Sequence, residues 1–137
     1  MTTISSVMTR DVEVIRPNES IQRAAQMMKD FDIGALPVCD GKRLLGMITD
    51  RDITLRSTAD GKMPADVSVA DVMSEQIIYC TEDETTEDVM DQMGECQVRR
   101  LPVINDQKEL VGIVSLGDLA TRQSSDTDKT LREISAP

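Results

Sequence analysis

Seven residues near the middle of the chain, Gly46-Met47-Ile48-Thr49-Asp50-Arg51-Asp52, decide the fold because their pattern occurs twice. The second copy is Gly112-Ile113-Val114-Ser115-Leu116-Gly117-Asp118. Both copies read glycine, two apolar residues, a hydroxyl residue, two variable residues and aspartate. This order is typical of a buried strand that ends at a hydroxyl residue where a helix begins.

The repeat extends outward from this motif. Upstream matches stand 65 positions apart, Val7-Met8-Thr9 with Val72-Met73-Ser74 and Leu36-Pro37-Val38 with Leu101-Pro102-Val103. The motif copies stand 66 apart, so one residue is inserted in the turn around 105–107. The 137-residue chain is therefore a tandem repeat. We expect a first repeat with its linker at 1–65, a second repeat at 66–122 and a polar tail at 123–137.

Each copy predicts a short opening turn and then the order strand, helix, strand, strand, helix. In the first copy Ser20 is the expected N-cap, Asp40-Gly41 the hairpin turn and Gly34 a left-handed cap. The predicted apolar helix face is Ile21, Ala24, Ala25 and Met28. The expected ranges are 4–8, 12–15, a helix from Ser20, 36–39, 44–49 and 50–56, then 69–73, 77–80, 86–96, 101–104, 110–115 and 116–122.

A sheet with helices on one side needs a second layer to bury its other face. We therefore expect an α/β (α+β) fold of tandem βαββα repeats. The two copies are expected to pack about a pseudo-two-fold axis, with sheets inside, helices outside and two matching clefts between them.

The composition disfavours several classes of function. The net charge is −10, with a single Tyr and a single Phe, so direct binding of nucleic acid is not expected. The sequence has no His, which is the commonest general base and metal ligand. No nucleophile–base pair, phosphate-binding Walker loop or metal-ligand cluster stands out. We expect a protein that is not an enzyme and has no metal site.

Three cysteines without a Cys-x-x-Cys pair favour a reducing compartment. The sequence shows no signal peptide and no run of 18 apolar residues. We expect a cytoplasmic location and no membrane association.

The motif suggests a chemistry for the site. A helix start offers free N–H groups to a phosphate, Thr49 or Ser115 adds a hydroxyl, and Asp52 or Asp118 can accept both hydroxyls of a ribose. The combination suits a nucleoside phosphate. The same spacing is typical of a capping box, in which each side chain satisfies a donor at the helix end. Both interpretations stay open on the sequence.

In this order, and twice, the motifs resemble the cystathionine β-synthase (CBS) domain pair, or Bateman module, over about residues 4–122. The resemblance implies a stand-alone, non-catalytic regulatory or sensor module that binds adenosine nucleotides (AMP, ADP, ATP or NAD) in its clefts. The nucleotide would be a ligand, and no cofactor is required. The resemblance further implies a homodimer and a protein partner regulated in trans. The alternative is a structural or oligomerisation module with unoccupied clefts.

The resemblance also assigns residues. It implies that Thr49 and Ser115 contact phosphate or ribose, and that Asp52 and Asp118 hold the ribose hydroxyls. Arg51, Arg99 and Arg100 are further candidates for phosphate, unless they are solvated or paired with nearby acids. Arg51 has Gly117 as its counterpart, so the two sites should differ in phosphate affinity. Backbone groups would bond the adenine edge, at Ala35 and Leu36 and at Arg100 and Leu101.

Overall fold

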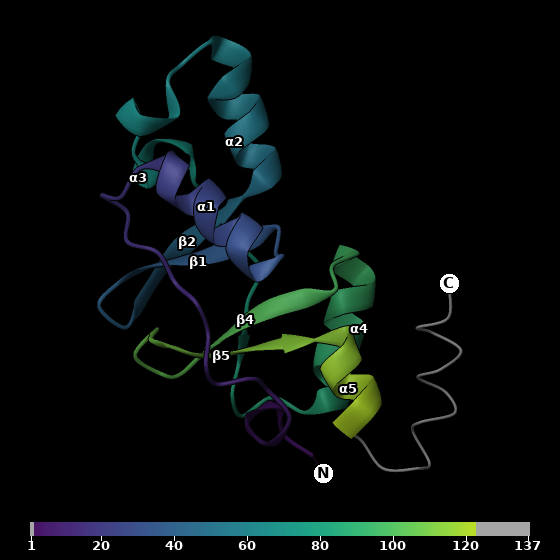
Figure 1. Ribbon diagram of the computed structural model, residues 1–137. Coiled ribbons are helices and arrows are strands. Elements are labelled where there is room, and N and C mark those ends of the chain that lie inside the picture. Colours follow the sequence, from purple (N-terminus) through teal and green to yellow (C-terminus); the bar gives the residue numbers. More distant parts are fainter. Residues whose placement is uncertain (1, 123–137) are drawn as a thin grey trace. The chain divides into compact units, whose positions relative to one another are not determined.

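The structure is a computed structural model, in which the backbone is described for residues 2–122 and the side chains for residues 2–120. The predicted tail at 123–137 lies outside the described residues. The chain forms two compact units (Figure 1). Residues 13–77 make up the first, called here the central unit. Of the described residues, 2–12 together with 78–122 make up the other, called the terminal unit.

The central unit contains an antiparallel hairpin and its helices. β1 and β2 pair with Ala35 opposite Thr49 and Asp40 opposite Arg43, and Gly41 in the turn has a φ of 62°. Except for the strand at 12–15, the strands and helices predicted for this region are confirmed, with small shifts at their ends. The elements are α1 (Ile21–Phe31), β1 (Ala35–Asp40), β2 (Arg43–Thr49), α2 (Asp50–Arg56), the 3-10 turns η2 (Thr58–Asp60) and η3 (Pro64–Asp66), and α3 (Val69–Val72).

Helix α1 begins as predicted and packs with a slightly different face. The Ser20 side chain accepts a hydrogen bond from Arg23 N at 3.1 Å, which satisfies one free donor of the first turn. The buried face is Ile21, Ala24, Met27 and Met28, whereas Ala25 is exposed. Because successive residues lie about 100° apart around a helix, a face centred near Ala24 leaves Ala25 outside it.

Gly34 is not the left-handed cap that the sequence predicted. The left-handed residue after α1 is Asp32, with φ 54° and ψ 51°, and Gln97 occupies the same place after α4 (Thr86–Cys96). Aspartate adopts this conformation more readily than most residues because its short polar side chain can bond locally. Gly34 instead lies against the Asp50 side chain, since a Cβ on Gly34 would be 3.1 Å from Asp50 Oδ2.

The predicted strands at 12–15 and 77–80 are much shorter in the structure. Ile15 alone forms a bridge, parallel to Val38, through bonds of 3.0 Å from Ile15 N to Pro37 O and from Cys39 N to Ile15 O. The other segment is reduced to β3 (Cys80–Thr81), which runs parallel to β4 (Arg100–Ile104) with Cys80 opposite Val103.

The terminal unit repeats the hairpin and helices of the central unit. β4 pairs antiparallel with β5 (Leu110–Ser115), with Arg100 opposite Ser115. α4 has the predicted bounds and buries Val89 and Met93, while Met90 is partly buried. The remaining elements are the opening turn η1 (Ile4–Ser6), which takes up part of the predicted 4–8 turn, and α5 (Leu116–Arg122).

Each unit is completed by the opening segment of the other sequence repeat. In the central unit Val69 N donates to Glu19 O at 2.8 Å, and in the terminal unit Ile4 N donates to Glu84 O at 2.9 Å. Val69 is the repeat counterpart of Ile4, and Glu84 is the counterpart of Glu19. The compact units therefore divide the chain differently from the predicted boundaries at 1–65 and 66–122.

This arrangement explains the glycine that opens each motif. A side chain on Gly46 would overlap the Ser74 carbonyl oxygen. A Cβ on Gly112 would lie 2.7 Å from Met8 Sδ and 2.8 Å from Thr9 O. Both glycines are buried where an opening segment crosses the hairpin, and only glycine permits that approach.

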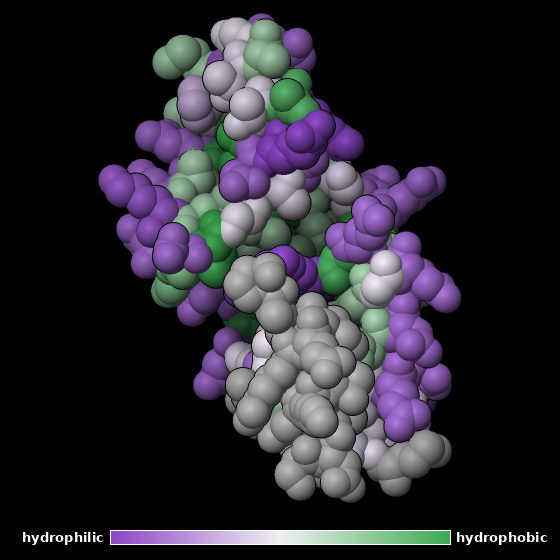
Figure 2. All heavy atoms as spheres, turned by 90° about the vertical axis from the view of Figure 1, so that its right-hand side faces the viewer, coloured by the Kyte–Doolittle hydropathy of each residue, from purple (hydrophilic) through white to green (hydrophobic). Residues whose placement is uncertain are grey.

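Each unit has its own apolar core. The predicted α/β (α+β) class is confirmed, with helices packed against small sheets in both units. The face drawn in Figure 2 has hydrophobic residues interspersed among the hydrophilic ones. None of the helices in the described part of the chain is long and apolar enough to cross a membrane. The central core is built on Ile15, Ile21, Ala24, Leu36, Val38, Ile48, Val67, Val69 and Val72, and the terminal core on Ile4, Val7, Met8, Val89, Met93, Leu101, Val103, Val114 and Leu119.

Candidate functional site

The motif of the central unit forms a complete capping box at the start of α2. Thr49 Oγ1 accepts a hydrogen bond from Asp52 N at 3.0 Å. Asp52 Oδ2 accepts one from Thr49 N, also at 3.0 Å. Thr49 is extended, with φ −119° and ψ 163°, so the strand turns into the helix at this residue.

The terminal unit builds the same arrangement at the start of α5. Ser115 Oγ accepts from Asp118 N at 3.0 Å, and Asp118 Oδ2 accepts from Ser115 N at 3.0 Å. The capping role that the sequence left open is therefore present in both units. It uses one oxygen of each carboxylate, and a carboxylate offers about four lone-pair sites. Acceptor capacity for the two hydroxyls of a ribose remains.

Asp52 has one further neighbour. Its Oδ1 lies 3.8 Å from Arg56 Nε, one helical turn on, and the Asp52 side chain is 14% exposed. Such a long ion pair with a half-exposed arginine contributes little to stability, since solvent screens it.

The hairpin brings the remaining predicted residues to the motif. Ala35 lies opposite Thr49 and Leu36 opposite Ile48 in the central unit. In the terminal unit Arg100 lies opposite Ser115. The Leu36 and Leu101 side chains are buried in the two cores, so only their backbone groups are candidates for contact with a ligand.

The predicted arginines are exposed. Arg51 follows the cap of α2, and its backbone N donates to Asp50 Oδ1 at 2.8 Å. Arg99 and Arg100 precede and open β4 beside Ser115, and Arg99 O accepts from Leu116 N at 2.8 Å. Among the side chains of residues 2–120, no carboxylate lies within 4.0 Å of these three guanidinium groups. Within the described side chains the three arginines are thus exposed and form no ion pair.

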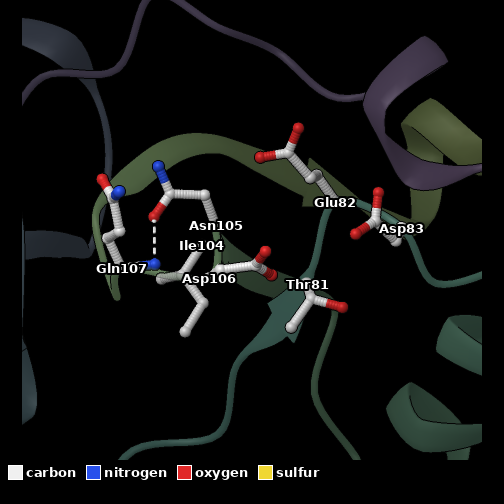
Figure 3. Close-up of a pocket in the computed structure, with 7 residues that line it drawn as sticks. All are labelled: Thr81, Glu82, Asp83, Ile104, Asn105, Asp106 and Gln107. Atoms are coloured by element: carbon white, nitrogen blue, oxygen red, sulfur yellow. Dashed lines mark hydrogen bonds between the residues drawn. The ribbon is translucent and has the colours of Figure 1, made fainter.

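Two cavities in the terminal unit are lined by other residues. The first, of about 260 Å³, lies between the end of β3 and the β4–β5 turn, and Glu82, Asp83 and Asp106 surround it (Figure 3). Its Asn105 is occupied in the turn, where Oδ1 accepts from Gln107 N at 2.9 Å and from Glu109 N at 3.0 Å. This turn holds the residue inserted in the second repeat. Thr81, Ile104 and Gln107 complete the lining.

The second cavity, of about 390 Å³, is a groove on α4 that reaches the start of α5. It combines apolar and acidic side chains. None of the ten predicted site residues lines either cavity. The groove is lined by Met90, Asp91, Met93, Gly94, Glu95, Val98 and Leu116.

Among the described residues, no group of three His, Cys, Asp or Glu side chains is placed to hold a metal ion.

The cysteines are free thiols. Burial raises the pKa of Cys39 to about 11. Burial, with a smaller contribution from the Glu84 charge, raises the pKa of Cys80 to about 12. Both thiols stay protonated at neutral pH and are poor nucleophiles.

Comparison with known proteins shows similarity along nearly the whole chain. The model of the CBS domain family matches residues 4–57 and 69–125. The CBS domain-containing protein YhcV of Bacillus subtilis is 44% identical over 125 residues, which cover 91% of this chain and 88% of that protein.

Two solved structures extend the similarity to the fold. The crystal structure of Hypoxic Response Protein I, which has two coordinated zinc ions, has a TM-score of 0.80 and 39% identity, covering 90% of this chain and 100% of that chain. The CBS domain pair of protein MJ0100, in complex with 5′-methylthioadenosine and S-adenosyl-L-methionine, has a TM-score of 0.72 and 28% identity. It covers 87% of this chain and 97% of that one.

Proposed function

Because the chain belongs to the CBS domain family, we propose that it is a non-catalytic regulatory module that binds adenosine nucleotides at the motif of each unit. The observation that carries the proposal is the duplicated pair of hydroxyl and acid, Thr49 with Asp52 and Ser115 with Asp118. Each pair lies where a strand ends and a helix begins. The MJ0100 domain pair supports it, since both of its ligands contain adenosine.

The roles of the side chains follow from their chemistry. The carboxylate accepts the two ribose hydroxyls, and the Thr or Ser hydroxyl bonds the ribose or the first phosphate. Backbone groups at the start of β1 and β4, around Ala35–Leu36 and Arg100–Leu101, bond the adenine edge. Arg51, Arg99 and Arg100 meet the phosphates as charged donors. AMP, ADP, ATP and NAD all present this adenosine half.

The ligand would act as a signal and not as a cofactor. Binding shifts the population of conformations only by its differential affinity for them. We propose that the module works as a homodimer in the cytoplasm and that a protein partner regulated in trans reads the shift. The sequence repeats at 1–65 and 66–122 would each supply one motif.

A structural or oligomerisation module is the second candidate. The capping boxes favour it, because they give both motifs a purpose that needs no ligand. In that case the Asp side chains serve only the starts of α2 and α5.

Thermal unfolding with AMP, ADP, ATP, NAD and adenosine separates the two candidates. A ligand at 100 times its Kd stabilises the folded state by about 2.7 kcal/mol. Asp52→Asn and Asp118→Asn keep an acceptor for the cap and remove the charge, so they should reduce the ligand-induced shift. Asp30→Asn on the exposed side of α1 is the matched control and should leave the shift unchanged. An unshifted melting curve with all five compounds at millimolar concentration favours the structural module.

A further inference from the structure

The two sites carry opposite charges at one pair of structurally matched positions. In the central unit Asp50 N donates to Gly34 O at 2.9 Å. In the terminal unit Leu116 N donates to Arg99 O at 2.8 Å. The same backbone bond thus joins the residue before the hairpin to the first residue of the helix in both units. Gly34 corresponds to Arg99, and Asp50 corresponds to Leu116.

The Asp50 carboxylate is held in place in the central unit. Its Oδ1 accepts from Arg51 N at 2.8 Å, and its Oδ2 would lie 3.1 Å from a Cβ on Gly34. The Asp50 carboxylate therefore lies beside Gly34, and Gly34 is the position that corresponds to Arg99 in the terminal unit. Sequence reasoning missed Asp50, although its exchange for Leu116 was visible in the aligned motifs.

The neighbouring positions do not compensate for this exchange. Ala35 and Arg51 in the central unit correspond to Arg100 and Gly117 in the terminal unit, so each unit has one arginine there. The acid of the motif is the same in both units, Asp52 and Asp118. Around the motif, the negative charge of Asp50 offsets the positive charge of Arg51 in the central unit. In the terminal unit the positive charges of Arg99 and Arg100 add to each other.

We infer that the two sites sort adenosine ligands by charge, with the terminal site preferring phosphorylated nucleotides and the central site preferring adenosine derivatives without phosphate. This inference rests on the proposed function and adds the residues that set specificity, Arg99 and Leu116 against Gly34 and Asp50. A difference of two unit charges near the surface changes the affinity for a phosphate on the order of tenfold or more. The preference should weaken as salt screens these exposed charges.

Exchanging the paired side chains tests the inference. The Arg99→Gly/Leu116→Asp variant gives the terminal site the side chains of the central site. The Gly34→Arg/Asp50→Leu variant does the reverse. Gly34 has no left-handed φ, and the terminal unit holds this same pair of residues, Arg99 and Leu116, at the matched positions. Lys62→Ala, which removes a positive charge from the exposed linker, is the control.

The measurement is calorimetric titration with AMP and with adenosine at low and high salt. In the wild type, AMP should bind one site at least tenfold more tightly than the other, and Asp118→Asn should remove that tight site while Asp52→Asn leaves it. Arg99→Gly/Leu116→Asp should lower the AMP-to-adenosine affinity ratio at least tenfold, and Gly34→Arg/Asp50→Leu should create a second tight AMP site. Lys62→Ala should leave the ratio unchanged.

Two results would overturn the inference. If AMP and adenosine bind both sites with the same affinity ratio, and the exchanges leave that ratio unchanged, the sites do not sort by charge although the proposed function stands. If neither compound gives heat with the wild type, the proposed function fails and the inference fails with it.

Discussion

Met47 and Ser74 exchange two backbone hydrogen bonds, of 3.0 Å from Met47 N to Ser74 O and 2.8 Å from Ser74 N to Met47 O. They come from different copies of the sequence repeat. Ile113 and Thr9 form the matching pair in the terminal unit, at 2.9 and 2.8 Å. Because each hairpin is bridged by the opening segment of the other repeat, the unit of sequence duplication is not the unit of packing.

The exchange of opening segments between the two sequence repeats predicts which fragment of the chain folds. A fragment of residues 13–77 keeps Val67, Val69 and Val72, which belong to the central core. A fragment of residues 1–65 lacks all three and should lose several kcal/mol of burial, about 1.5–3 kcal/mol for each large apolar side chain. Urea unfolding followed by circular dichroism should be cooperative for 13–77 and shallow for 1–65. A cooperative transition for 1–65 alone would contradict the exchange.

The motif glycines should tolerate no side chain. Gly46→Ala and Gly112→Ala force a methyl group against the crossing segment, which should lower the free energy of unfolding by about 1–3 kcal/mol. Differential scanning calorimetry measures the effect as a lowered Tm.

Gly94 is the matched control for these glycines. It lies in α4 with no atom within 4 Å of an added Cβ. Gly94→Ala should therefore stabilise the protein by about 0.5–1 kcal/mol, since alanine loses less backbone entropy in a helix. Equal destabilisation by all three substitutions would show that the crossing segments do not set the requirement for glycine.

The thiols should differ in reactivity. Cys96 is exposed, whereas Cys39 and Cys80 are buried with pKa values raised to about 11 and 12. At pH 8 a thiol reagent should modify one cysteine of the native protein and all three in denaturant. Cys96→Ser should abolish the native reaction, and rapid modification of a second thiol would contradict the burial of Cys39 and Cys80.

The same pKa shifts predict how stability depends on pH. In the unfolded chain these thiols titrate near 9.0, below their folded values. The unfolded state therefore loses protons first as the pH rises, and the stabilisation that is present below pH 9.0 is lost toward pH 11 and 12. Replacing both residues with alanine should flatten the pH dependence of the unfolding free energy in this range, as measured by urea titration. An unchanged slope would contradict the shifts.

Local features were readable from the sequence, and long-range ones were not. The helix bounds at 50–56, 86–96 and 116–122 follow from caps and apolar spacing, and so does the Ser20 cap. The left-handed position could not be fixed, because Asp32 and Gly34 both suit the end of α1. The partner of each opening segment was hidden as well, since two equivalent repeats offer it two equivalent hairpins.

The candidate site shows the same division between local features that the sequence predicts and long-range features that it does not. The spacing of Thr49 and Asp52 predicted their mutual contact, and the hairpin register explains why Ala35 and Arg100 lie beside the motifs. The exchanges of Asp50 for Leu116 and of Gly34 for Arg99 were visible in the aligned repeats, but only the two backbone bonds showed that these positions are neighbours in each unit.

Titration of AMP into the wild type and into the Asp52→Asn/Asp118→Asn double variant tests the central proposal most directly. Asparagine retains an oxygen for each helix cap, so the double variant should keep its cooperative unfolding. We predict saturable heat for the wild type and none for the folded double variant at the same AMP concentration. The same dissociation constant for both proteins would show that these carboxylates do not hold the ligand.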